Sequence, residues 1–204
     1  MSRPSREQVR ARLLGAATEE FRARGYAGAR LDVIARAAGF TKGAVYSNFD
    51  SKQGLFTALL AHHADALLES LLAGVDGVGV DEGVRRIGLA LGARVVADPQ
   101  WHLLVLELAV QAGRDDVVRR AYTAQRRAQR AALAELVRDR ADQWGAVGLD
   151  GTAAAQVLLA VLLGLTVEHA ADPVAVGEAE IATAVSAVLA GLLAAAAARP
   201  AGAG

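Results

Sequence analysis

The sequence predicts an all-α fold of about nine helices. Hydrophobic residues make up 53% of the 204 residues, whereas aromatic residues make up only 4%. Ala, Leu and Val therefore supply most of the apolar content, and Ala and Leu are strong helix formers. Breakers containing glycine or proline divide the chain into apolar segments of helical length. Cysteine is absent, which excludes a disulfide scaffold, and the length favours one or two domains.

The first 52 residues predict three helices and the start of a fourth. Apolar residues recur every four positions over 9–21, and we expect Gly25 to end this first helix as a C-terminal cap. A second short helix is expected over 31–38. The Thr41 side chain is expected to cap the third helix, and residues 50–53 (Asp-Ser-Lys-Gln) are expected to open the fourth with an Asp variant of the capping box.

The remainder of the chain predicts a long fourth helix and five more. These five are expected at about 82–97, 100–112, 115–142, 150–169 and 175–197. Residues 199–204 (Arg-Pro-Ala-Gly-Ala-Gly) are expected to be frayed. The division into domains falls near residue 50, which gives an N-terminal domain over 1–50 and a C-terminal domain over 51–204.

Charge is unevenly distributed although the totals balance at 22 basic and 22 acidic residues. Residues 1–52 hold ten Lys and Arg against five Asp and Glu, which leaves 12 basic and 17 acidic residues for the rest. A basic N-terminal part on an acidic remainder favours a nucleic-acid-facing module. The first 25 residues carry charges throughout and hold no apolar run, so we expect no secretory signal and a cytoplasmic location.

Residues 31–49 form a helix-turn-helix pattern. Gly39 can adopt the left-handed conformation that turns the chain between two short helices. Ile34, Ala35, Ala38 and Val45 are placed to pack these helices together. The outer face of the second helix presents short or polar side chains suited to a DNA groove, namely Lys42, Gly43, Ala44, Tyr46, Ser47 and Asn48.

These motifs resemble the TetR family of bacterial transcriptional regulators over roughly residues 9–60. The family's Phe-x-x-x-Gly-Tyr is present as Phe21-Arg-Ala-Arg-Gly25-Tyr26. Its pattern Ile-Ala-x-x-Ala-Gly-x-[Ser/Thr]-x-Gly-x-x-Tyr-x-x-Phe-x-x-Lys is matched by Ile34-Ala35, Ala38-Gly39, Thr41, Gly43, Tyr46, Phe49 and Lys52. The resemblance implies a three-helix DNA-binding domain, with the third helix as reader, attached to a helical domain that binds a ligand and dimerises.

The resemblance also implies DNA contacts for individual residues. Tyr46 matches a phosphate-contacting tyrosine, and Asn48 stands where histidine is common. Arg30 replaces the Ser or Thr that often caps the second helix; it can reach a phosphate but cannot accept the capping bond. The implied contacts are phosphates or bases for Thr41 and Lys42, bases for Gly43 and Ala44, and further DNA contacts for Arg30, Tyr46, Ser47, Asn48 and Lys52. The alternatives are a core role for Tyr46 and ordinary solvated lysines at 42 and 52.

Two C-terminal segments, Thr152–His169 and Glu178–Ala197, are apolar on almost every face. A helix that is apolar all round must be buried all round. We expect these helices to form a homodimer interface, because a two-fold dimer can hold two reader helices about 34–36 Å apart for successive major grooves. The alternative is burial in a monomer core. A membrane span needs about 20 strongly apolar residues, so we expect no membrane association.

Polar residues at otherwise apolar positions mark candidate effector contacts. The resemblance places the effector pocket among the fourth to eighth helices, so the candidates are Glu107, Gln111, Tyr122 and Gln156. Lone polar residues on helices are more often surface groups or satisfied core groups. The abundance of Leu, Val and Ala favours a small, mainly apolar ligand.

Enzymatic signatures are missing from the sequence. It has no cysteine nucleophile, no P-loop and no Gly-x-Gly-x-x-Gly motif. His62 and His63 are adjacent, so they diverge by about 100° on a helix and would not share one metal. We therefore expect neither an enzyme nor a bound metal or cofactor.

The sequence thus predicts a ligand-responsive transcriptional regulator, above all a dimeric repressor that an effector releases from a palindromic double-stranded operator. An activator, or a regulator without a small effector, is the alternative within this class. The alternative from another class is a helical ligand-binding or scaffold protein whose N-terminal domain has lost DNA recognition.

Overall fold

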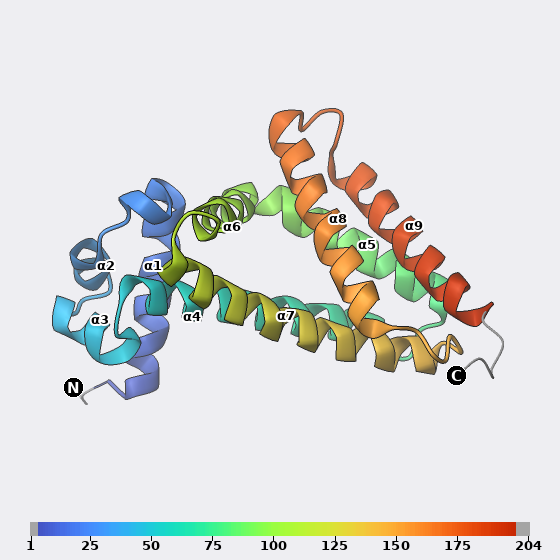
Figure 1. Ribbon diagram of the computed structural model, residues 1–204, viewed down its shortest axis with the longest axis horizontal. Coiled ribbons are helices and arrows are strands. Elements are labelled where there is room, and N and C mark those ends of the chain that lie inside the picture. The colour runs from blue at the N-terminus through green and yellow to red at the C-terminus, as the bar shows by residue number, and fades with distance from the viewer. Residues whose placement is uncertain (1–3, 199–204) are drawn as a thin grey trace. The chain divides into compact units, whose positions relative to one another are not determined.

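The computed structural model describes residues 4–198, apart from the side chains of residues 70, 72 and 73. Its helices in this range are α1 (Arg6–Gly28), α2 (Leu31–Ala37), α3 (Lys42–Phe49), α4 (Lys52–Val75), α5 (Val80–Ala97), α6 (Pro99–Ala112), α7 (Asp116–Gln143), α8 (Gly151–Ala171) and α9 (Glu178–Ala197) (Figure 1). The all-α prediction is confirmed, with the later helices beginning and ending within three residues of the expected positions. The expected fraying of residues 199–204 lies outside the described residues.

The chain forms two compact units. Unit 1 contains residues 1–65 and 103–126, and unit 2 contains residues 66–102 and 127–204. Helices α4, α6 and α7 each contribute residues to both units. Unit 1 therefore holds α1 to α3 together with the beginning of α4, most of α6 and the beginning of α7.

The helix-turn-helix of unit 1 is built as its apolar pattern predicts. Helix α1 packs against α2, and α2 packs against α3. Ile34 of α2 and Val45 of α3 are fully buried, and Phe21 of α1 is fully buried as well. Gly39 turns the chain between α2 and α3 with a φ of 79°, the left-handed conformation that glycine adopts at little cost.

Helix α1 is interrupted at Gly25, the residue expected to end it. Gly25 has φ 66° and ψ 176°, which kinks the helix, and a further short stretch runs to Gly28. The regular helix therefore ends at Gly25, as the sequence predicts, and the short stretch to Gly28 follows the break. The positive φ does break the regular hydrogen-bonding pattern there, which leaves backbone N–H groups after Gly25 in need of other partners.

Two predicted caps are corrected. Thr41 occupies the N-cap position of α3, but its side chain accepts no capping hydrogen bond from the described residues. At α4 the capping oxygen belongs to Ser51, whose Oγ accepts from the Gly54 N–H at 3.0 Å. Asp50 has a φ of 59°, so it ends α3 in a left-handed conformation instead of opening α4.

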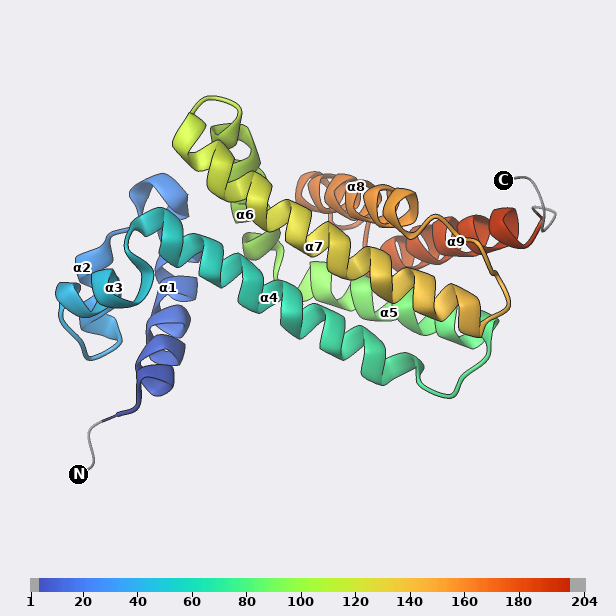
Figure 2. The same cartoon turned by 60° about the horizontal axis from the view of Figure 1, so that its bottom comes forward.

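Unit 2 is held together by close packing of α5 against α9, and α8 also packs against α9 (Figure 2). Gly88 and Gly92 lie where α5 meets the backbone of α9, and the Ser186 hydroxyl donates to the Val84 carbonyl at 3.3 Å. Val95, Ile181 and Val185 form a buried core between these helices. Small residues thus allow the two helix backbones to approach closely.

Helices α8 and α9 leave much apolar surface uncovered. Both are long and apolar enough to cross a membrane by length and composition, but only 22% and 33% of their most apolar windows are buried. Some of the exposed residues of each helix form a stripe at helical spacing: Val157, Ala160, Gly164 and Val167 on α8, and Thr183, Ala187, Ala190 and Ala194 on α9. We call these two stripes the α8–α9 face.

Candidate nucleic-acid interface

Helix α3 presents a small exposed face opposite its buried side. Val45 and Phe49 point into unit 1 and are at most 5% exposed. Lys42, Gly43 and Ser47 are exposed, and Tyr46 is 45% exposed. A tyrosine this open does not serve as a core aromatic, so the structure removes the core alternative for Tyr46. Thr41 is exposed and Ala44 half-buried beside this face.

Two features of this face suit close approach to a polyanion. The Lys42 ammonium lies 5.8 Å from the centre of the Tyr46 ring, within cation–π range, and Lys42 is exposed. At Gly43 an added Cβ would meet only Thr41 Oγ1 at 3.6 Å, which is ordinary contact. Packing within the protein therefore does not require glycine at position 43.

The C-terminal end of α3 is held by Arg10 of α1. The guanidinium donates to the Asn48 carbonyl at 3.2 Å and lies 4.5 Å from the centre of the Phe49 ring. A cation at a helix C-terminus is favourable for the helix dipole. The Asn48 side chain is half-buried and donates to the Ala44 carbonyl at 2.8 Å, so its amide nitrogen is committed to its own helix.

The N-terminus of α2 is organised by two carboxylates. Arg30 is the N-cap residue and has no side-chain capping bond among the described residues, as its chemistry dictates. Its guanidinium instead pairs with Asp32 at 3.2 and 3.0 Å, and hydrogen bonding from Arg30 lowers the pKa of Asp32. Both side chains of this pair are solvent-accessible, and such pairs are weak.

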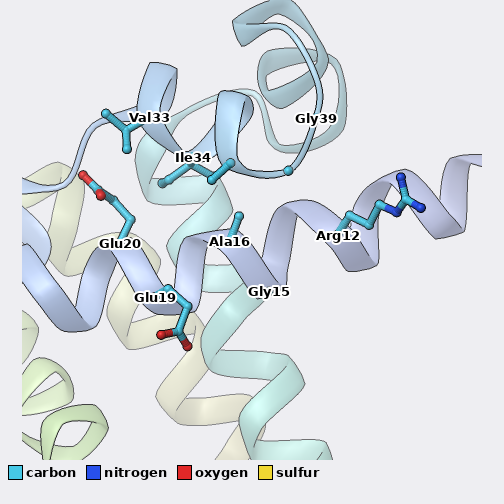
Figure 3. A pocket seen from close by; sticks show the side chains of 10 residues that line it. Arg12, Gly15, Ala16, Glu19, Glu20, Val33, Ile34 and Gly39 are labelled. Carbon is cyan, nitrogen blue, oxygen red and sulfur yellow. The ribbon is translucent and has the colours of Figure 1, made fainter.

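Glu20 of α1 supplies the acceptor that Arg30 lacks. Its Oε1 accepts from the Arg30 backbone N–H at 3.1 Å, and the residue is only 9% exposed. Figure 3 shows Glu20 reaching from α1 toward α2 at the edge of an open groove of about 690 Å³, which is also lined by Arg12, Glu19 and Val33. Sequence reasoning missed Glu20 and Arg10, because their partners lie in other helices.

Lys52 is less accessible than the resemblance implies. Its Nζ donates to the Ala27 carbonyl at 3.0 Å and lies 5.1 Å from the centre of the Tyr26 ring. The side chain is half-buried, and this burial lowers the pKa of the Lys52 ammonium. Lys52 therefore braces unit 1 internally in this structure.

The predicted effector residues do not form one site in either unit. Glu107 and Gln111 are one turn apart on α6 and are joined by a hydrogen bond of 3.3 Å. Tyr122 lines a cavity of about 10 Å³ with Tyr26, Gln53, Phe56, Thr57, Leu108, Val118 and Ala121, which is room for a single water at most. Gln156 belongs to unit 2 and is exposed on α8. The four residues thus divide between the two units.

Glu107 already has partners within unit 1. Its carboxylate accepts from the backbone N–H groups of Tyr26 at 3.1 Å and Ala27 at 3.4 Å. These are N–H groups that the kink at Gly25 leaves outside the regular helix. The contacts join residues 81 and 80 positions apart in the chain, so the sequence offered no local signal for them.

The fold and the exposed face of α3 define a helix-turn-helix protein with an all-helical C-terminal part. Comparison with protein families gives the particular family. Residues 13–59 match the model for bacterial regulatory proteins of the tetR family, and residues 80–194 match the C-terminal domain of BetI-type transcriptional repressors. The chain therefore belongs to the TetR family, whose members are transcriptional regulators.

Individual relatives agree with this assignment. The chain is 41% identical to the HTH-type transcriptional activator FasR of Mycolicibacterium smegmatis over 70 residues, which are 34% of this chain and 32% of FasR. Its matches to curated relatives span between about a quarter and less than half of their lengths.

Solved structures share the whole fold. A transcriptional regulator from Rhodococcus sp. Rha1 has a TM-score of 0.70 at 21% identity, over 97% of this chain and 100% of that one. The transcriptional regulator FadR from Bacillus subtilis in complex with stearoyl-CoA has a TM-score of 0.66 at 17% identity, over 90% and 97%. At these identities the likeness is one of fold.

Proposed function

We propose that this protein is a dimeric, ligand-responsive repressor that binds a palindromic DNA operator through α3. The observation that carries the proposal is the exposed face of α3, where Lys42, Gly43 and Tyr46 are accessible while Val45 and Phe49 anchor the helix. A short helix with one buried and one small, polar face is the element that helix-turn-helix proteins place in the major groove.

Each exposed residue has a distinct proposed role. Lys42 and Tyr46 hold phosphates, and the missing side chain at Gly43 lets the helix approach the bases closely. Thr41, Ala44 and Ser47 lie along the same face, whereas Arg30, Asn48 and Lys52 contact DNA only after leaving the partners they have here. Since phosphate contacts release counterions, binding weakens as salt rises.

The test is operator binding by a double variant. DNA duplexes are selected by the purified wild-type protein from fragments flanking its own gene, and binding is followed by fluorescence anisotropy at several salt concentrations. Lys42→Ala with Tyr46→Ala should abolish specific binding, while Arg127→Ala, which removes an exposed charge on α7, should bind as the wild type does. Equal binding by the double variant would refute the role of α3.

Failure of the folded wild-type protein to bind any fragment at low salt would favour the scaffold alternative. A trapped effector must first be excluded by mass spectrometry of the denatured protein. Reporter expression from the selected promoter, with and without the gene for this protein, separates repression from activation.

The dimer is proposed to form through the α8–α9 face. Two stripes of mainly apolar residues lie exposed on these helices, and an apolar patch of this kind marks an interface. We propose that a second copy of the chain covers it, so that the apolar length of α8 and α9 reflects dimerisation within a cytoplasmic protein and not membrane insertion.

Oligomeric state tests this interface. Ala160→Glu places a charge in the α8 stripe, and it should convert the dimer to a monomer in size-exclusion chromatography with light scattering. The control is Ala132→Glu at an exposed position of α7. A dimer that survives Ala160→Glu combined with Ala187→Glu would place the interface elsewhere.

The proposed effector is a small, mainly apolar molecule. The fold shared with the stearoyl-CoA complex of FadR makes acyl compounds a reasonable first group of probes. Release of the selected DNA when one of these compounds is added would support an inducible repressor. Conversion of a bound compound by the purified protein would contradict that part of the proposal.

A further inference from the structure

We propose that Glu107 is a positioning residue that ties α6 to the connection between α1 and α2, and that it is not an effector ligand. This inference rests on the proposed function, because its consequence is the placement of the DNA-reading helices. The inference is based on the turn Gly25–Ala27. Glu107 accepts hydrogen bonds from the N–H groups of Tyr26 and Ala27, and Lys52 donates to the Ala27 carbonyl. We call this arrangement the turn clamp.

Glu107 satisfies backbone donors that the turn itself cannot satisfy. Its Oε2 accepts from the Tyr26 N–H at 3.1 Å and its Oε1 from the Ala27 N–H at 3.4 Å. Gln111 donates to the same Oε1 at 3.3 Å. Tyr26 is only 6% exposed, and a buried N–H without an acceptor is costly. Removing the carboxylate therefore penalises the turn in its present position.

Gly25 makes this grip possible. Its φ of 66° interrupts the helix, and the next two N–H groups, of Tyr26 and Ala27, donate to Glu107. A Cβ at this position would lie 2.7 Å from Glu107 Oε2, so a side chain here would displace the carboxylate. Both the backbone conformation and the space at Gly25 are thus matched to Glu107.

Lys52 completes the clamp from α4. Its Nζ donates to the Ala27 carbonyl at 3.0 Å and lies over the Tyr26 ring. The same ring makes an edge contact with Phe56 of α4 at a centroid distance of 5.2 Å. The turn is therefore held by α4 and α6 together, through its backbone and through the Tyr26 side chain.

The clamp lies directly upstream of α2. Only three residues separate Ala27 from Leu31, where α2 begins, and the next backbone N–H held by a carboxylate is that of Arg30, bound to Glu20. A displacement of α6 relative to α1 must break the bonds to Tyr26 and Ala27 or carry the turn with it. In either case the position of the start of α2, and with it the position of α3, is no longer fixed relative to α1.

Hydrogen–deuterium exchange of individual amides tests the clamp without requiring an operator. Glu107→Gln keeps the size of the side chain but replaces one acceptor oxygen with a donor, and Glu107→Ala removes both acceptors. Because hydrogen bonds to charged groups are the stronger kind, exchange at Tyr26 and Ala27 should rise about tenfold or more in Glu107→Ala and less in Glu107→Gln. Glu135→Gln, at an exposed position of α7, is the control.

A cycle with Lys52→Met separates positioning from general stabilisation. If Glu107 and Lys52 hold the same turn, the double variant should raise exchange by less than the product of the two single effects. The turn clamp would be refuted if the two variants changed the exchange rates multiplicatively, or if exchange rose equally in α8 and α9. Glu107 would then be an ordinary stabilising residue.

DNA binding gives a separate readout. Glu107→Ala should lower affinity for a duplex selected by the wild-type protein by about tenfold, and Glu107→Gln should lower it by less, with the salt dependence unchanged because no phosphate contact is removed. If the wild type selects no duplex, the proposed function fails while the exchange experiment still decides the clamp. Unchanged affinity despite faster exchange at the turn would refute the link from clamp to DNA reading.

Discussion

Gly88 of α5 allows a test of the close packing between α5 and α9. Alanine inside a helix is normally more stable than glycine by about 1 kcal/mol. At position 88, however, a Cβ would lie 2.5 Å from the Ala182 carbonyl oxygen and would clash with the Ser186 hydroxyl. Ordinary contact begins at 3.4 Å, so the helices would have to separate by roughly 1 Å, and a gap of that size forfeits a large part of the dispersion energy along the interface.

The expected net effect of Gly88→Ala is destabilisation by about 2 kcal/mol, since overpacking typically costs about 1–3 kcal/mol and the added Cβ meets the α9 backbone at Ala182 as well as a side chain. For a chain of this size that lowers the melting temperature by about 4–8 °C. The matched control is Gly15→Ala in α1, where nothing lies within 4 Å of the new Cβ, and this variant should be slightly more stable than the wild type.

The assay is urea denaturation followed by circular dichroism at one fixed protein concentration, because the stability of the proposed dimer depends on concentration. Gly88→Ala at or above wild-type stability, with Gly15→Ala also stabilised, would show that helix propensity alone decides both positions. The close approach of α5 and α9 would then contribute nothing to the fold.

Three further outcomes are expected. Phe56→Ala should cost about 3–5 kcal/mol in urea denaturation, because the ring is 1% exposed and packs edge-on against Phe21 at 4.8 Å; a loss below about 1 kcal/mol would contradict this packing. Gly43→Ala should leave stability unchanged or raise it by up to about 1 kcal/mol and yet weaken DNA binding, whereas equal weakening of both would indicate a folding role. Hydrogen bonds from Arg85 and Arg86 lower the pKa of Glu82 from 4.5 to about 2. The stabilisation that this carboxylate gives the start of α5 is therefore complete above pH 4.5 and is lost as the pH falls through about 2. An NMR titration of Glu82 should show the lowered pKa, and an unshifted pKa would exclude the pairing.

The sequence by itself determined the helical fold and the face of α3. Both follow from local rules: strong helix formers with apolar residues at helical spacing, and a glycine where the chain must turn with positive φ. Lys42, Gly43 and Tyr46 were predicted as accessible because Val45 and Phe49 fix which side of a short helix is buried. At α4 the capping residue is Ser51 and not the predicted Asp50, since neighbouring residues of similar chemistry compete for one capping position.

Only the tertiary structure decided what Glu107, Lys52 and Glu20 do. The sequence predicted Glu107 as an effector contact and Lys52 as a DNA contact; in the structure both bond to the backbone of the turn Gly25–Ala27, and Glu20 supports the start of α2 from another helix. Each of these bonds satisfies a backbone group exposed by a kink or a helix end. Which side chain reaches such a group depends on how helices distant in the sequence pack together, and the spacing of hydrophobic residues does not determine that packing.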